Sequence, residues 1–110
     1  MSFNIILVDS FEKELKHLSK KYPSIKKDLA NLATQLLKEP TFGIPIGNDC
    51  YKIRMAITSK GKGKSGGARV ITYVIINQET VLLTEIYLKS EHDSADVNIL
   101  IHRLKAQGLI

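Results

Sequence analysis

Hydrophobic positions near the start of the chain change from a strand pattern to a helical one. Residues 3–8 form an apolar run rich in β-branched side chains, long enough for a strand and too short for a helix. Asp9 and Glu12 then have the spacing of a capping box, which predicts a helix start. Apolar residues recur on one face of this helix: Phe11, Leu15, Leu18 and Tyr22. Pro23 ends the helix, because proline disfavours the α conformation in the residue before it.

A second helical pattern follows directly. Ser24 is placed to cap it, and Pro40 ends it. Its apolar stripe comprises Ile25, Leu29, Leu32, Ala33 and Leu36. Because the connection at Tyr22-Pro23 is so short, the two helices are expected to be antiparallel neighbours in a hairpin.

The middle of the chain predicts a loop and then three strands. Residues 41–49 contain Gly43, Pro45 and Gly47 and are predicted to be a loop. Strands are expected at about residues 50–57, 68–76 and 81–88, and they are joined closely enough to require antiparallel pairing. In the first strand Lys52 and Arg54 alternate with apolar residues, so they share an exposed face. The middle strand is apolar on both sides, as expected of a central strand covered by helices.

A last helix completes the pattern. Asp93-Ser94 is predicted to cap it and Gly108 to end it. Its apolar stripe comprises Val97, Leu100, Ile101 and Leu104. A strand, a helical hairpin, a three-stranded antiparallel meander and a C-terminal helix together predict an α+β fold, in a single domain over residues 1–110.

Composition excludes several classes of protein. With 44% hydrophobic and 25% charged residues among 110, the chain resembles an ordinary globular domain. No apolar run is long enough to span a bilayer and no secretory leader is evident, so we expect a cytoplasmic protein that does not act at a membrane. Cys50 is the single cysteine, and His17, His92 and His102 are scattered. Neither a disulfide framework nor a metal site nor another cofactor is expected.

The net charge of +5 is concentrated in one segment. Residues 50–78 contain no acidic residue and six basic ones: Lys52, Arg54, Lys60, Lys62, Lys64 and Arg69. The rest of the chain has ten basic and eleven acidic residues, so its net charge is −1. A basic excess focused in one segment is typical of a polyanion-binding site, whereas a dispersed excess is usually a solvated surface.

Residues 59–69 form a glycine-rich link with lysines at alternate positions: Lys60, Lys62 and Lys64. Gly63-Lys64-Ser65 looks like the end of a P-loop, but Thr58 stands where that motif needs its first glycine. The motif also needs a strand-to-helix setting, so we reject nucleotide triphosphatase activity. The link is either a solubilising connector or a flexible cationic arm that binds the phosphates of RNA.

The base of this link predicts a cation cluster. Antiparallel pairing across the link is expected to bring Lys52, Arg54 and Arg69 together. Clustered cations repel one another, whereas phosphodiester chemistry uses them to hold the scissile phosphate and stabilise its developing charge. A lysine among cations can also have a pKa low enough for a general base. The alternative is that these are ordinary exposed strand residues that protect a sheet edge.

Other polar candidates are weaker. The histidines lie far from the basic segment in the sequence, which favours surface positions over catalytic ones. Cys50, among apolar neighbours, is predicted to be packed rather than nucleophilic. Tyr51, Tyr73 and Tyr87 could stack on bases, although strand tyrosines more often belong to the core or to a sheet face.

Four segments together resemble a known family. They are Cys50-Tyr51-Lys52-Ile53-Arg54, the lysine–glycine link, Gly66-Gly67-Ala68-Arg69-Val70-Ile71-Thr72-Tyr73-Val74, and Ile86-Tyr87-Leu88-Lys89-Ser90. With the element order, they resemble the RelE/ParE superfamily of toxins from type II toxin–antitoxin systems, over essentially the whole chain. The link is most similar to the HigB-like branch.

This resemblance implies a metal-independent endoribonuclease, an mRNA interferase that enters the ribosomal A site and inhibits translation. In that reaction the 2′-hydroxyl attacks the adjacent phosphate, and a cognate antitoxin, often a helix-turn-helix protein, neutralises the toxin. The resemblance assigns Lys52 or Arg54 to proton removal or phosphate binding and Arg69 to stabilisation of the developing charge. Lys89 is the closest match to a basic residue that the family has after the last strand.

One region departs from the family pattern. Some RelE members carry a functional Tyr near the start of the final helix, where this chain has Asp93-Ser94-Ala95-Asp96-Val97. His92 is a candidate substitute as proton donor. The alternative function is a ParE-like inhibitor of DNA gyrase without nuclease activity, and the third is a plain nucleic-acid-binding module.

Overall fold

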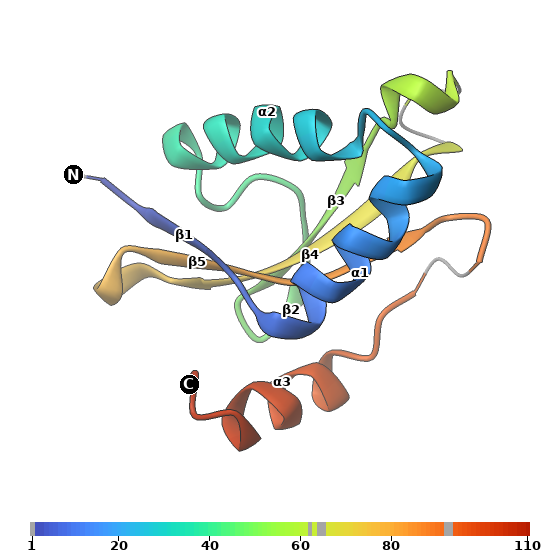
Figure 1. The fold of residues 1–110 in the computed structure, drawn as a ribbon. Coiled ribbons are helices and arrows are strands. Elements are labelled where there is room, and N and C mark those ends of the chain that lie inside the picture. Colours follow the sequence, from blue (N-terminus) through green and yellow to red (C-terminus); the bar gives the residue numbers. More distant parts are fainter. Residues whose placement is uncertain (1, 62, 64–65, 92–93) are drawn as a thin grey trace.

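The computed structural model describes residues 2–61, 63, 66–91 and 94–110 (Figure 1). Its helices are α1 (Asp9–Lys21), α2 (Ile25–Lys38) and α3 (Val97–Ala106). Its strands are β1 (Asn4–Leu7), β2 (Ile44–Gly47), β3 (Cys50–Met55), β4 (Ala68–Ile75) and β5 (Thr80–Leu88). The 3₁₀ turns η1 (Thr58–Lys60) and η3 (Ile76–Gln78) follow β3 and β4. The predicted α+β class and its order of elements are confirmed.

Within the described residues the strands form one sheet in the order β1-β5-β4-β3-β2. β1 is parallel to β5, and the other neighbouring strands are antiparallel. β4 is the central strand, as its apolar sequence predicts. Figure 1 shows α1 and α2 on one side of the sheet and α3 on the other. The helical hairpin and the C-terminal helix therefore lie on opposite faces of the sheet.

The predicted apolar stripes are buried between these layers. The buried helical residues are Phe11, Leu15 and Leu18 in α1, Ile25, Leu29, Leu32 and Leu36 in α2, and Leu100 and Leu104 in α3. β4 and β5 are buried along most of their length. Full burial of such a side chain contributes about 1.5–3 kcal/mol relative to exposure. This core fixes β3, β4 and the helical hairpin relative to one another.

The predicted loop at residues 41–49 is wrong in part, because it contains strand β2 and a tight turn. β2 pairs only with β3 among the described strands and lies at the edge of the sheet. An edge strand tolerates Pro45, whose missing N–H can face away from the ladder. Asn48 (φ 53°) and Asp49 (φ 63°) turn the chain back into β3 in the left-handed conformation that short hairpin turns require.

Two of the three predicted helix starts, those of α1 and α3, shift, whereas Ser24 holds the N-cap position of α2 as predicted. Val8 is buried, has an extended conformation and holds the N-cap position of α1, so Asp9 is already helical. The cap of α3 is Asp96, whose side chain accepts a hydrogen bond from the Ile99 N–H at 3.1 Å. Ser94 therefore precedes the helix, and Asp93 lies outside the described residues. In each case the chain stays extended until its apolar residues reach the core, which outweighs the local capping signal.

Candidate functional site

Antiparallel register places the predicted cations on one face of the sheet. Arg54 of β3 lies directly opposite Arg69 of β4, and Arg69 lies opposite Tyr87 of β5. In the neighbouring row Lys52 pairs with Ile71. Because side chains alternate along a strand, Lys52, Arg54 and Arg69 share a face. The predicted convergence of these three residues is therefore confirmed.

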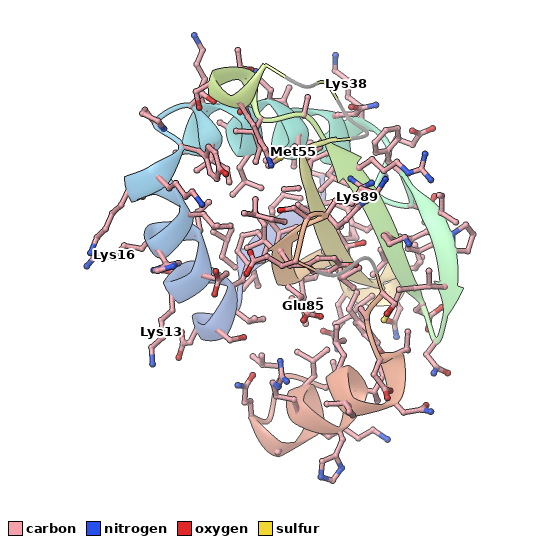
Figure 2. All side chains as sticks on the ribbon, turned by 90° about the vertical axis from the view of Figure 1, so that its right-hand side faces the viewer. Lys13, Lys16, Lys38, Met55, Glu85 and Lys89 are labelled. Atoms are coloured by element: carbon pink, nitrogen blue, oxygen red, sulfur yellow. The ribbon has the colours of Figure 1, made fainter. Side chains whose placement is uncertain are left out.

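The opposite face of β3 belongs to the core. Ile53 and Met55 alternate with the two cations and are buried. Figure 2 shows Met55 on the side of α2 and Glu85 on the side of α3. The helical hairpin thus packs against one face of β3, and the side chains of Lys52 and Arg54 lie on the opposite face.

The three cations differ in their access to solvent. Arg54 is exposed and Lys52 is half-buried, whereas Arg69 is only 1% exposed. One hydrogen bond of Arg69 runs from Nη1 to the Ala68 carbonyl oxygen at 3.2 Å. A charged group is costly to bury without partners, so Arg69 is held by its surroundings rather than by water. On this face Arg54 and Lys52 are therefore accessible from solvent, and Arg69 lies beneath the surface.

Lys89 is brought to the same end of the sheet. Its N–H donates to the Gly67 carbonyl oxygen at 3.2 Å, immediately before β4 begins, and its side chain is exposed. Gly67 packs so closely on β3 that a Cβ atom there would lie 2.2 Å from the Met55 carbonyl oxygen. This contact requires glycine, and it fixes the point at which the lysine–glycine link returns to the sheet.

The link is anchored at its start as well as at its end. Its first residues form η1, where Thr58 and Ser59 make hydrogen bonds to Asp28 and Ser24 of the helical hairpin. Lys60 is half-buried, with Nζ 5.5 Å from the centroid of the Tyr22 ring. Lys62 and Lys64, the other predicted RNA-binding lysines, lie outside the described residues.

Asp28 is a site residue that sequence reasoning missed. Burial of its carboxyl by itself raises the pKa, but hydrogen bonds from Thr58 and Ser24 and the charge of Lys27 outweigh this and lower the pKa below its ordinary value of 3.8. The contact joins residues thirty positions apart. The one available signal was the isolation of Asp28, the single acidic residue in the lysine-rich segment 20–38.

A cavity of about 210 Å³ adjoins Arg54 between β3 and α2. Its lining includes Asp28, Asn31, Gln35, Phe42, Arg54 and Thr58. It connects the exposed cation of β3 with the residues that anchor the link. Of the three cations, Arg54 is the one that lines this cavity.

The weaker candidates are now placed. His17 and His102 are exposed, and His92 lies outside the described residues. Cys50 is 1% exposed, with Sγ 3.7 Å from the Asn48 carbonyl oxygen. Burial, with the nearby charge of Asp49, raises the pKa of the Cys50 thiol to about 11, so this thiol is packed rather than nucleophilic, as predicted.

The tyrosines are core or sheet-face residues. Tyr87 is buried, while Tyr51 and Tyr73 are half-buried and pack against the core. Burial and the Asp49 charge raise the pKa of Tyr73 above its ordinary value. In the described part of the chain, no three His, Cys, Asp or Glu residues are grouped as a metal ion requires. No helix there is both long and apolar enough to cross a membrane.

Solved structures with the same arrangement come from Escherichia coli. A mutant of the toxin RelE in the free state is 19% identical, with a TM-score of 0.62 over 84% of this chain and 88% of that chain. The isolated RelE toxin is 18% identical, with a TM-score of 0.60 over 94% of this chain and 99% of that chain.

The chain has the RelE fold. The toxin–antitoxin complex RelBE also matches, at 20% identity and a TM-score of 0.58, over 78% of this chain and 94% of that chain. No protein-family model and no curated protein sequence matches the chain. The fold expected from the motifs is confirmed, and the HigB-like branch stays a prediction.

Proposed function

We propose that this chain is the toxin of a type II toxin–antitoxin system and cleaves mRNA on the ribosome. The observation that carries the proposal is the meeting of Lys52, Arg54 and Arg69 on one face of a RelE fold. A phosphodiester carries the opposite charge, and its negative charge grows during cleavage, so cations gathered on one face favour both its binding and its transition state.

In the proposed reaction the ribose 2′-oxygen forms a bond to the adjacent phosphorus. The bond from phosphorus to the 5′-oxygen of the next nucleotide breaks, which leaves a cyclic phosphate and a 5′-hydroxyl. Arg54 is exposed and meets the phosphate. Lys52, beside it on the same face, removes the 2′-hydroxyl proton or shares the phosphate, and Arg69 stabilises the developing charge.

Lys89 completes the proposed site from the end of β5. Its position is fixed by the backbone hydrogen bond to Gly67, two residues before Arg69. From there its ammonium group can neutralise charge on the phosphate or on the leaving oxygen. The proton for the 5′-oxygen comes from a group not yet identified, and His92 is the candidate that the sequence offers.

A cognate antitoxin and a cytoplasmic location belong to the same proposal. RelE of Escherichia coli has been solved in a toxin–antitoxin complex, which supports an antitoxin partner for a chain of this fold. We expect that partner to carry a helix-turn-helix domain, and we expect the target mRNA to be bound in the ribosomal A site.

The test is expression of the chain in cells, followed by mapping of mRNA 5′ ends. New 5′ ends inside translated reading frames are expected within minutes of induction. Growth arrest with DNA breaks and intact mRNA would instead identify a ParE-like gyrase inhibitor. A catalytically silent control is the variant Lys52→Ala with Arg54→Ala, which should give no new ends at equal expression.

A further inference from the structure

The turn between α1 and α2 is joined to the first turn of the lysine–glycine link by a compact set of hydrogen bonds. Asp28 Oδ1 accepts from the Thr58 hydroxyl at 2.6 Å, and Oδ2 accepts from the Thr58 N–H at 2.9 Å. The Ser24 hydroxyl donates to Asp28 Oδ2 at 2.9 Å and accepts from the Ser59 N–H at 2.8 Å. We call Ser24, Asp28, Thr58 and Ser59 the hairpin latch.

An aromatic contact reinforces the hairpin latch. The ammonium groups of Lys21 and Lys60 lie 5.6 and 5.5 Å from the centroid of the same Tyr22 ring. Each cation is attracted to the electron-rich face of the ring. The contact of Lys60 ties η1 to the helical hairpin and places its charge beside the same aromatic ring as that of Lys21.

The hairpin latch also gathers lysines that are distant in sequence. The hairpin tip carries four exposed lysines, and η1 adds one that is half-buried; in order they are Lys20, Lys21, Lys26, Lys27 and Lys60. The one acidic residue between positions 20 and 38, Asp28, has both carboxylate oxygens engaged by the latch. Residues 20–38 thus contain five lysines and one acidic residue, although the chain outside residues 50–78 has a net charge of −1.

We propose that the hairpin tip and η1 form a docking surface for the phosphate backbone of structured RNA, outside the cluster of Lys52, Arg54 and Arg69. The inference rests on the proposed function in assuming that the ligand is RNA. Ammonium groups act as point charges that accept phosphates in many orientations. A protein interface usually has an apolar centre that is poor in lysine. The hairpin tip exposes little apolar surface, because Ile25 is fully buried and Tyr22 is half-buried, and this disfavours an acidic protein as the occupant.

Salt dependence of RNA binding tests this surface directly. The probe is a fluorescent RNA hairpin with 2′-O-methyl riboses, which cannot undergo attack by a 2′-hydroxyl. Lys26→Gln with Lys27→Gln is expected to reduce the slope of log K against log salt by roughly 0.7–0.9 per lysine that contacts a phosphate. The matched control is Lys13→Gln with Lys16→Gln, an exposed pair on α1 that Figure 2 shows pointing away from the molecule.

The variant Asp28→Asn distinguishes the positioning role of the hairpin latch from the effect of charge alone. The change removes a negative charge, so general electrostatics predicts tighter RNA binding. The asparagine NH₂ cannot accept from the Thr58 N–H or hydroxyl, so release of η1 predicts RNA binding weakened several-fold. Ser24→Ala breaks the same network without changing charge and is expected to weaken binding in the same direction. Tighter binding by Asp28→Asn would overturn the positioning role.

The outcomes distinguish this inference from the proposed function. Equal salt slopes for the hairpin-tip variant and its control would overturn the docking surface, whatever the chain does to mRNA. Polyglutamate serves as a second probe, which mimics an acidic protein. If the hairpin-tip variant loses binding to polyglutamate but keeps its RNA binding, the docking surface for RNA is overturned and an acidic protein partner is indicated. Lys52→Ala with Arg54→Ala is expected to abolish cleavage while the hairpin-tip effect on binding persists. If that variant still cleaves mRNA, the assignment of Lys52 and Arg54 is wrong. If the wild-type chain leaves mRNA intact, the proposed function fails, and the docking result then stands alone.

Discussion

Arg54 and Arg69 face each other across β3 and β4, yet Arg54 is exposed and Arg69 is 1% exposed. In the proposed function, such a pair offers a phosphate one cation at the surface and a second cation that is shielded from water. The arrangement suits the stabilisation of growing negative charge better than simple capture of a polyanion.

Arg69→Ala should therefore reduce mRNA cleavage more than it reduces RNA binding. Removal of one preorganised charge stabiliser typically costs about 10²-fold or more in rate. If the proposed function is right, growth inhibition by this variant is expected to be lost at equal expression, as measured by colony counts, together with its single-turnover cleavage. Lys13→Ala, on the exposed side of α1, is the control and should remain toxic. Unchanged toxicity of Arg69→Ala would show that the catalytic assignment is wrong.

Gly67→Ala should destabilise the chain at the end of the link. The added Cβ would lie 2.2 Å from the Met55 carbonyl oxygen, so β3 or β4 must shift. Overpacking of this kind costs about 1–3 kcal/mol in the free energy of unfolding, measurable by urea titration. Gly61→Ala is the comparison, because space is open there and only the positive φ of 73° is strained. Equal losses at the two positions would contradict the close approach.

The hairpin latch should be sensitive to acid. The pKa of folded Asp28 is below its ordinary value of 3.8, so the stabilisation is present above that pH. It is lost as the pH falls through the lower, folded pKa. Backbone amide shifts of Thr58 and Ser59, followed by NMR from pH 6 to pH 2, should change with the Asp28 titration. In Asp28→Asn this pH dependence should be absent.

Cys50 should resist thiol reagents in the folded protein. With its pKa raised to about 11, roughly one thiol in a thousand is ionised at pH 8, and the side chain is 1% exposed. Reaction with an aromatic disulfide reagent should be slow in buffer and fast in concentrated urea. Fast reaction without denaturant would show that β3 opens readily at its first residue.

Most of the fold was predictable because its signals are local. The stripes of α1 and α2 and the alternation around Lys52 and Arg54 follow from helix and strand periods alone. β2 was missed because Pro45, Gly47 and the preceding Gly43 favour a loop everywhere except at a sheet edge. The start of α3 was misplaced because Asp96 and Ser94 are both acceptable caps by sequence.

The site was predictable only where strand register determines it. Pairing of adjacent strands brings Arg54 and Arg69 together, and that follows from two neighbouring segments. The burial of Arg69 depends on packing in three dimensions, and the contact of Asp28 with Thr58 joins residues thirty positions apart. No periodicity encodes such contacts, so the hairpin latch emerged from the structure.

Mapping of mRNA 5′ ends after brief induction tests the central claim most directly. The wild-type chain is expected to produce new 5′ ends inside translated frames, which disappear when translation initiation is blocked. The variant Lys52→Ala with Arg54→Ala should produce none at equal expression. Intact mRNA during growth arrest by the wild-type chain, or unchanged cleavage by the double variant, would contradict a ribosome-dependent nuclease built on these cations.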